Sequence, residues 1–253
     1  MILNLVHLGR VGYAEGLEVQ RRLVEARVAG LIGNTLVLLE HPPVLTLGRN
    51  SDRKNVLATV EFLAYRGVEL HEINRGGDVT YHGPGQLVGY PIVDLRSFAG
   101  TGLGRRLGAV EYVRWVEEAL IRACGDFGVK TERVAGRTGV WTLAGGSVEE
   151  KKIAAIGVHI SRGITSHGFA LNVTTDLRDF ELIVPCGISD RAVTSLELEV
   201  SEDVGADLTM EKVMHAVARQ FGRVLEHQIL WVESLGDLSP ELAEIPLTPG
   251  RKD

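Results

Sequence analysis

Cys186 sits in a bend-forming sequence, Ile-Val-Pro-Cys-Gly-Ile, at residues 183–188. Pro185 fixes a backbone angle before the thiol, and Gly187 frees the backbone after it. A thiol at such a bend can stand exposed at the edge of a binding site and attack a carbonyl carbon as a thiolate. The same sequence also suits a small buried side chain in a turn, since free cysteines are usually buried. The local sequence leaves both interpretations of Cys186 open.

Lys152 opens the apolar run Ile-Ala-Ala-Ile-Gly of residues 153–157. A strand of this kind can remove water from the amine, which favours the neutral form that accepts a proton. Glu149, Glu150 and Lys151 precede it, and this charge cluster also suits a solvated surface, where most lysines lie. On these grounds Lys152 is either a candidate base or a surface charge.

A glycine-rich segment, residues 75–92, begins Arg-Gly-Gly-Asp-Val-Thr-Tyr-His-Gly-Pro-Gly. Glycines allow another group to approach the main chain closely, so the polar side chains among them are presented rather than packed. The segment is therefore expected to form a wall of a binding site. Its glycine spacing fits neither the dinucleotide loop nor the GxxxxGK[ST] phosphate loop, and Pro84 removes an amide that such a loop would use.

Two histidines lie in glycine-flanked sequences, His82 in the segment above and His167 in Ser-His-Gly-Phe. Each can orient a substrate or exchange a proton, and each can equally be a hydrogen-bonded loop residue. His41, which precedes two prolines, is interpreted as structural. Neither HExxH nor CxxC spacing occurs, so a metal site is not expected.

The composition fits one large α/β domain, with 45% hydrophobic and 24% charged residues in a chain of 253. A net charge of −6 argues against general affinity for nucleic acid. The first residues lack a basic region and a cleavage site, so no secretory signal is expected. No apolar run approaches the ~18 residues of a membrane helix. With only two cysteines, free thiols in a reducing cytoplasm are expected.

Apolar periodicity predicts three long helices, at residues 13–29, 108–127 and 209–226. In the first, Leu17, Val24 and Val28 are expected to form the buried stripe, beside Leu23. In the second, Cys124 continues the apolar stripe and is predicted to be a core residue. Strands are predicted, mostly between glycine turns, at residues 3–8, 35–39, 44–47, 69–73, 86–94, 139–143, 153–160 and 169–173.

This order of elements indicates a mixed α+β layer rather than regular βαβ winding. Residues 1–227 are predicted to form the catalytic domain. Residues 228–253, which hold three prolines and end in charges, are predicted to be a loosely attached tail without a domain of its own.

Three motifs give the chain a resemblance to the lipoyl(octanoyl) transferase family. The first is the glycine-rich segment from Arg75 to Leu87. The second joins Lys-Ile-Ala-Ala-Ile-Gly at 152–157 with Ser-His-Gly-Phe-Ala-Leu-Asn-Val at 166–173. The third is Pro-Cys-Gly-Ile at 185–188. The match runs from about residue 35 to residue 196.

The resemblance implies the α/β (α+β) fold of the biotin/lipoate protein ligase catalytic domain, a mixed sheet with packed helices. It implies transfer of an octanoyl group from acyl carrier protein to a lysine of a lipoyl domain, in 2-oxoacid dehydrogenase E2 subunits or glycine cleavage H protein. It implies a catalytic pair, Cys186 and Lys152, and no cofactor. The acyl chain is expected to lie against Arg75, Gly76, Gly77, Asp78, Val79, Thr80, Tyr81, His82, Ala155, Ile156, Gly157, His167, Gly168, Phe169 and Ala170. Asp78 is given no catalytic role.

Three other functions are compatible with parts of this pattern. An ATP-dependent lipoate ligase shares the fold but needs no cysteine. A non-catalytic module that binds acyl groups or lipoyl domains needs neither nucleophile nor base. A cysteine hydrolase would pass the acyl group to water. For the transferase, an acidic carrier protein is expected to dock on a basic rim drawn from Arg133, Arg137, Lys151 or Arg162.

Overall fold

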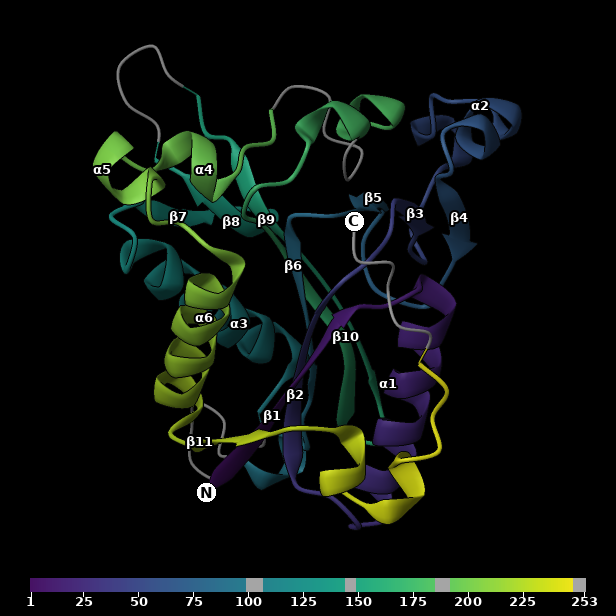
Figure 1. The fold of residues 1–253 in the computed structure, drawn as a ribbon, viewed down its shortest axis with the longest axis vertical. Helices are drawn as coiled ribbons and strands as arrows, with labels where there is room; N and C mark the ends of the chain where they lie inside the picture. Colours follow the sequence, from purple (N-terminus) through teal and green to yellow (C-terminus); the bar gives the residue numbers. More distant parts are fainter. Residues whose placement is uncertain (99–106, 144–148, 185–191, 248–253) are drawn as a thin grey trace.

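An eight-stranded mixed sheet forms the centre of the molecule in the computed structural model, which describes residues 1–98, 107–143, 149–184 and 192–247 (Figure 1). The strand order is β11-β1-β2-β6-β10-β9-β8-β7. In that order the strands span Gln228–Val232, Ile2–Arg10, Asn34–Glu40, Gln86–Ile92, Ile164–Asn172, Lys152–Ser161, Arg137–Thr142 and Thr131–Val134. β1 runs parallel to β11 and β2, and the other neighbours are antiparallel.

Helices cover both faces of this sheet. α3 (Ala109–Gly125) and α6 (Met210–Leu225) pack together on one face, and α1 (Tyr13–Val28) packs on the other (Figure 1). Two apolar clusters result, because strand side chains point alternately to the two faces. Leu36 and Leu38 of β2 belong to the cluster under α3 and α6, whereas Val37 belongs to the cluster under α1.

A second sheet of three strands, in the order β4-β3-β5, adjoins the main sheet. Its strands are Glu69–Glu72, Val44–Leu47 and Val79–His82. The short helix α2 (Val60–Tyr65) leads into β4, and α4 (Leu196–Glu199) and α5 (Glu202–Gly205) precede α6. Single 3₁₀ turns lie at Arg53–Asn55, Leu95–Ser97, Leu177–Leu182, Leu235–Asp237 and Pro240–Leu242.

The predicted mixed sheet with packed helices is confirmed, and so are the three long helices. Thr209 caps α6 by accepting a hydrogen bond from the backbone N–H of Lys212 at 3.3 Å. Cys124 is fully buried in the core beneath α3, as predicted.

The buried face of α1 differs from the predicted stripe. The residues that face the core include Val19, Leu23 and Ala26, whereas Leu17 and Val24 are only half-buried. The periodicity fixed the helix but not its rotation about its axis, because both faces carry apolar side chains. Val24 and Val28 still pack against the core beneath α1, and Leu17 and Val24 line a cavity described below.

The C-terminal segment is not loosely attached, which corrects the prediction for the described residues after 227. β11 pairs in parallel with β1, from Gln228 opposite Ile2 to Val232 opposite Val6. Leu235, Leu242 and Ile245 then join the core beneath α1. Three buried apolar side chains and a strand ladder hold this segment to the domain. Among the helices of the described residues, none is long and apolar enough to cross a membrane.

Candidate functional site

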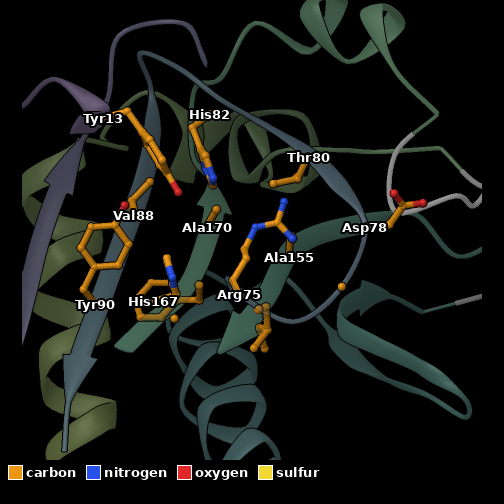
Figure 2. Close-up of a pocket in the computed structure, with 15 residues that line it drawn as sticks. Tyr13, Arg75, Asp78, Thr80, His82, Val88, Tyr90, Ala155, His167 and Ala170 are labelled. Carbon is orange, nitrogen blue, oxygen red and sulfur yellow. The ribbon is translucent and has the colours of Figure 1, made fainter. Parts of the chain in front are cut away.

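A row of three cavities follows the antiparallel pair β9 and β10. The central cavity encloses about 470 Å³, part of it open to solvent, and contains most of the residues expected to bind an acyl chain (Figure 2). A second cavity, lined by Lys152 and called the lysine cavity below, adjoins one end of the central cavity. The two cavities share Thr80, Ala155 and Ala170. A third cavity, lined by Leu17, Val24 and Ile164 among others and called the distal cavity below, adjoins the other end. It shares His167 with the central cavity.

Small residues form the floor of the central cavity. Ala155 pairs with Ala170, and Gly157 pairs with Gly168, across neighbouring strands of the sheet. The loop that carries Arg75 crosses over this floor, because Gly76 N–H donates to the carbonyl oxygen of Val158 at 3.1 Å. A side chain at Gly157 would meet Gly76 O at 2.8 Å, so glycine is what lets the loop approach the strand.

The wall from Arg75 to His82 divides between two sides of the second sheet. Thr80 and His82 line the central cavity. Val79 and Tyr81 point the opposite way into a separate apolar cluster, and the Tyr81 hydroxyl donates to Asp179 at 2.8 Å. This corrects the expectation that Val79 and Tyr81 face the ligand, and the cause is the two-residue alternation of β5.

Arg75 is buried at the inner part of this wall. Its guanidinium donates to the carbonyl oxygen of Thr46 at 2.6 Å and to the Thr46 hydroxyl at 2.8 Å. Asp78 lies at the outer end of the cavity, away from the other labelled side chains (Figure 2). Its carboxylate accepts hydrogen bonds from Asn55 and from Val79 N–H, so Asp78 holds its own loop together.

His82 and His167 are both buried, and burial lowers the pKa of His82 to about 3 and of His167 to about 4. After burial, His41 and Arg75 contribute to the low pKa of His82, and Arg75 contributes to that of His167. Both imidazoles are thus neutral at physiological pH. His82 Nδ1–H donates to Gln86 at 2.8 Å, and His167 Nε2–H donates to Asn74 at 2.8 Å.

Tyr13, Val88 and Tyr90 also line the central cavity, although the sequence did not single them out. Side chains alternate along the strand predicted at 86–94, so Val88 and Tyr90 were expected on the same face. This alternation is the sequence signal that could have identified them as cavity residues. Tyr90 is held by His41, whose Nε2 accepts the Tyr90 hydroxyl at 2.6 Å. His41 Nδ1–H donates to Val11 O at 2.6 Å, so the structural role predicted for His41 is confirmed.

Ile156 and Phe169 were expected to supply apolar wall. Both border the central cavity, but they also belong to the core on the opposite face of the sheet. The Phe169 ring stacks on Phe221 of α6 at 5.4 Å between centroids. Part of the apolar surface of the cavity therefore comes from Val88 and from the alanine and glycine floor.

Lys152 lies in the lysine cavity and is 7% exposed, so it is not part of a solvated charge cluster. Its Nζ lies 4.8 Å from the centroid of the Trp141 ring, in the range of a cation–π contact. A side chain at Gly139 would lie 3.3 Å from Lys152 Cε and 2.6 Å from Ala154 O, and the φ of Gly139 is +127°. Glycine at 139 therefore leaves the space that the lysine occupies.

The chain after Cys186 returns to Lys152. Lys152 N–H donates to Ala192 O at 2.9 Å, and Thr194 N–H donates to Lys152 O at 2.9 Å. Cys186 itself lies outside the described residues. A line of side-chain hydrogen bonds connects the two cavities, from His82 to Gln86, from Gln86 to Asn172 at 2.9 Å, and from Asn172 to Thr194 O at 2.8 Å.

Within the described ranges, no group of three or more histidine, cysteine or acidic side chains is arranged to hold a metal ion. The row of cavities is elongated along β9 and β10, and Lys152 lies at one end of it.

Comparison with known proteins assigns the chain to one family. Residues 12–222 match the model of the lipoyl protein ligase A/B catalytic domain. An octanoyltransferase from Acidobacterium capsulatum is 81% identical over 245 residues, which cover 97% of this chain and 99% of that protein.

Solved structures extend the likeness of fold. A bipartite lipoate protein ligase from Thermoplasma acidophilum aligns with a TM-score of 0.68 at 19% identity, over 92% of this chain and 87% of that chain. A biotin protein ligase from Aquifex aeolicus aligns with a TM-score of 0.50 at 16% identity, over 88% of this chain and 70% of that chain. The fold class implied by the sequence resemblance is therefore confirmed.

Proposed function

The chain belongs to the octanoyltransferases of the lipoyl protein ligase A/B catalytic-domain family, and from this premise we propose that it transfers an octanoyl group from acyl carrier protein to a lysine of a lipoyl domain. The observation that carries the proposal is the identity of 81% to an octanoyltransferase across almost the whole chain. The acceptors would be lipoyl domains of 2-oxoacid dehydrogenase E2 subunits or of glycine cleavage H protein. Its place of action would be the cytoplasm, where thiols stay reduced.

The proposed reaction proceeds through an acyl-enzyme on Cys186. Lys152 takes the thiol proton, and the thiolate attacks the thioester carbonyl of the carrier protein. The bond from the acyl carbon to the carrier's sulfur breaks, and that sulfur leaves as a thiol with the proton from Lys152. The acceptor lysine then attacks the new thioester and forms an amide. Its proton passes through Lys152 to the departing Cys186 sulfur, and no ATP is consumed.

The surroundings of Lys152 support this exchange of protons. A ring face 4.8 Å from Nζ stabilises the ammonium that forms when the thiol loses its proton. The backbone bonds of Lys152 to Ala192 and Thr194 tie this strand to the segment that follows Cys186 by six residues. The backbone of Lys152 therefore pairs with residues 192–194, a short distance along the chain from Cys186.

The central cavity supports the choice of an acyl substrate. Its alanine and glycine floor leaves room for a methylene chain, and burial of each methylene contributes about 0.8 kcal/mol. Arg75, His82 and His167 are all engaged in hydrogen bonds to the protein, so they border the channel without needing a charged ligand. An octanoyl group with its carbonyl near Lys152 would extend along β9 and β10 into this space.

Within the basic rim expected for the carrier protein, we favour the side chain that lies near the proposed reaction centre. Arg162 lies at the turn between β9 and β10, at the opposite end of β9 from Lys152. Arg137 lies close to the proposed reaction centre, with its guanidinium carbon 5.9 Å from the Trp141 ring centroid. We therefore place the contact with an acidic carrier protein around Arg137.

A reconstituted assay tests the proposed function. Purified protein is mixed with octanoyl carrier protein and a lipoyl domain without ATP, and the mass of the lipoyl domain is measured. The expected result is one octanoyl group per lipoyl domain, with none when octanoic acid and ATP replace the thioester. The reverse pattern would identify an ATP-dependent ligase. Free octanoate alone would identify a hydrolase, and no reaction in either mixture would favour a binding module.

A further inference from the structure

The three cavities succeed one another along β9 and β10 in the order of the residues. Along β9, the lysine cavity is bordered by Lys152 and Ala155, the central cavity by residues 155–157, and the distal cavity by His159 and Ser161. Along β10, which runs the opposite way, the same order passes from Asn172 to Ile164. The three cavities therefore lie in a row, called the track below. This row leads away from Lys152 toward the turn between the two strands.

His167 closes this track between the central and distal cavities, and it borders both. Its backbone N–H donates to Gln20 of α1 at 2.7 Å, and its Nε2–H donates to Asn74 at 2.8 Å. The side chain thus spans from the sheet to the loop above it, and Figure 2 shows it between Tyr90 and Arg75. His167 is the register partner of Val158, where Gly76 bonds to β9, so strand, loop and imidazole meet at one level.

The space beyond this barrier is large and partly apolar. The distal cavity encloses about 710 Å³, part of it open to solvent. Leu17 and Val24 of α1 and Ile164 of β10 line it. A chain that passed His167 would therefore find further apolar wall. The imidazole stands between the two cavities, and its displacement would break its bond to Asn74 and leave the buried ring without that partner.

We propose that His167 is the specificity-determining residue that stops the acyl chain at eight carbons, and that the distal cavity takes longer chains when the imidazole is removed. This inference rests on the proposed transfer of an acyl group with its carbonyl near Lys152. The methyl end of the octanoyl chain then points at His167. A chain that outgrows the central cavity would have to displace the imidazole in order to extend into the distal cavity.

His167→Gly is the most direct test. The φ of His167 is +54°, a left-handed conformation that glycine adopts without strain, so the substitution removes the imidazole and preserves the backbone. Carrier protein is loaded with octanoyl, decanoyl, dodecanoyl or tetradecanoyl groups, and kcat/KM for transfer is measured with each. The ratio of the dodecanoyl to the octanoyl value is expected to rise by about tenfold or more over the unsubstituted protein, because burial of about two methylenes suffices for that change.

Val24→Trp provides the matched control, since Val24 borders the distal cavity and neither of the other two cavities, and packs at the margin of the core beneath α1. Alone, it is expected to leave octanoyl transfer unchanged. Combined with His167→Gly, it fills the distal cavity and is expected to abolish the gain with dodecanoyl. That reversal would show that the longer chain lies beyond position 167 and that the gain is not a general loosening of the protein.

Asn74→Ala decides the question if His167→Gly does not fold, as judged by circular dichroism. It removes the bond that holds the imidazole across the track and is expected to shift the length preference in the same direction by a smaller factor. The inference is overturned if the folded variants still transfer octanoyl and keep the original length profile. Failure of the unsubstituted protein to transfer octanoyl would instead overturn the proposed function.

Discussion

Three buried histidines around the central cavity are held as neutral imidazoles. Burial lowers the pKa of His41 and of His167 to about 4, and of His82 to about 3. His41 lies between Val11 and Tyr90, and its two hydrogen bonds need one protonated and one free nitrogen. His82 and His167 each donate one hydrogen bond to a side-chain amide oxygen. These neutral rings make hydrogen bonds around the cavity and add no positive charge beside Arg75.

Acid is expected to destabilise the protein through these rings. As the pH falls below about 6.5, the histidines of the unfolded chain bind protons that the folded protein excludes, so the free energy of unfolding decreases. At pH about 5, His41 alone is expected to cost about 2 kcal/mol. Urea unfolding at pH about 7.5 and about 5 measures the loss.

His41→Gln removes one titrating ring and should lose less free energy of unfolding between the two pH values than the unsubstituted protein. His7 offers a comparison, because it is exposed and its pKa is lowered by only partial burial. His7→Gln is expected to change the pH dependence little. Equal losses in the His41→Gln variant and the unsubstituted protein would contradict the assignment of a neutral buried His41.

At the scale of elements, β9 carries both the proposed catalytic base and half of the floor of the central cavity. Its first residue is Lys152, and Ala155 and Gly157 follow on the side of the cavities. β10 supplies the opposing half of the floor and the barrier at His167. The second sheet and the loop that carries Arg75 cover the central cavity on the side opposite this floor. The site therefore lies between two sheets rather than on a helix.

The C-terminal segment contributes stability through an edge strand and buried anchors. Leu242 is 2% exposed in the core beneath α1. Leu242→Ala is expected to lower the free energy of unfolding by about 2–5 kcal/mol, as buried leucine truncations do. Leu230→Ala in β11 is the control, because Leu230 is 49% exposed, and its effect should stay within about 0.5 kcal/mol. Equal, small effects in urea unfolding would mean that the segment is loosely attached after all.

The sequence predicted the long elements better than the contacts between them. Helices and core strands have strong periodicity, so they were found. β11 was missed because its side chains are half-exposed or exposed and its partner, β1, lies at the other end of the chain. β5 was missed because its residues were assigned to a glycine-rich loop. Its side chains alternate between two faces, so Thr80 and His82 lie on one face and Val79 and Tyr81 on the other.

Most residues that line the central cavity were predictable from motifs, but Tyr13, Val88 and Tyr90 were not, and neither was the arrangement of the site. Motifs indicated Lys152, Arg75 and His167, whereas the contact of Lys152 with Trp141 depends on a register shift between β8 and β9 that no local pattern shows. The division into three cavities depends on where the Gly76 loop crosses β9. Such contacts join residues far apart in sequence, so periodicity and spacing carry no signal for them.

At the scale of the whole molecule, the net charge of −6 makes the encounter with an acidic carrier protein depend on local charge. Arg137 lies beside the ring that contacts Lys152, whereas Arg162 lies about 30 Å along β9 from Lys152 by the rise of a strand. The two arginines therefore form a matched pair for testing where the carrier protein docks.

Arg137→Glu is expected to raise the KM for octanoyl carrier protein severalfold, and the increase should shrink in high salt, which screens charge. Arg162→Glu is expected to leave this KM unchanged. Initial rates of octanoyl transfer at two ionic strengths measure both effects. A larger effect at Arg162 than at Arg137 would mean that the carrier protein docks at the end of β9 opposite Lys152. That result would contradict docking near Arg137.

The acyl-enzyme on Cys186 is the central claim, and intact-mass spectrometry tests it most directly. The protein is incubated with octanoyl carrier protein in the absence of an acceptor, and the modified residue is then located by peptide mapping. The second thiol, Cys124, is fully buried, and burial raises its pKa to about 12, so it should stay unmodified. The account predicts one octanoyl group on Cys186 that disappears when a lipoyl domain is added. Octanoylation of the lipoyl domain at full rate by Cys186→Ala, with no adduct on Cys186 in the unsubstituted protein, would contradict it.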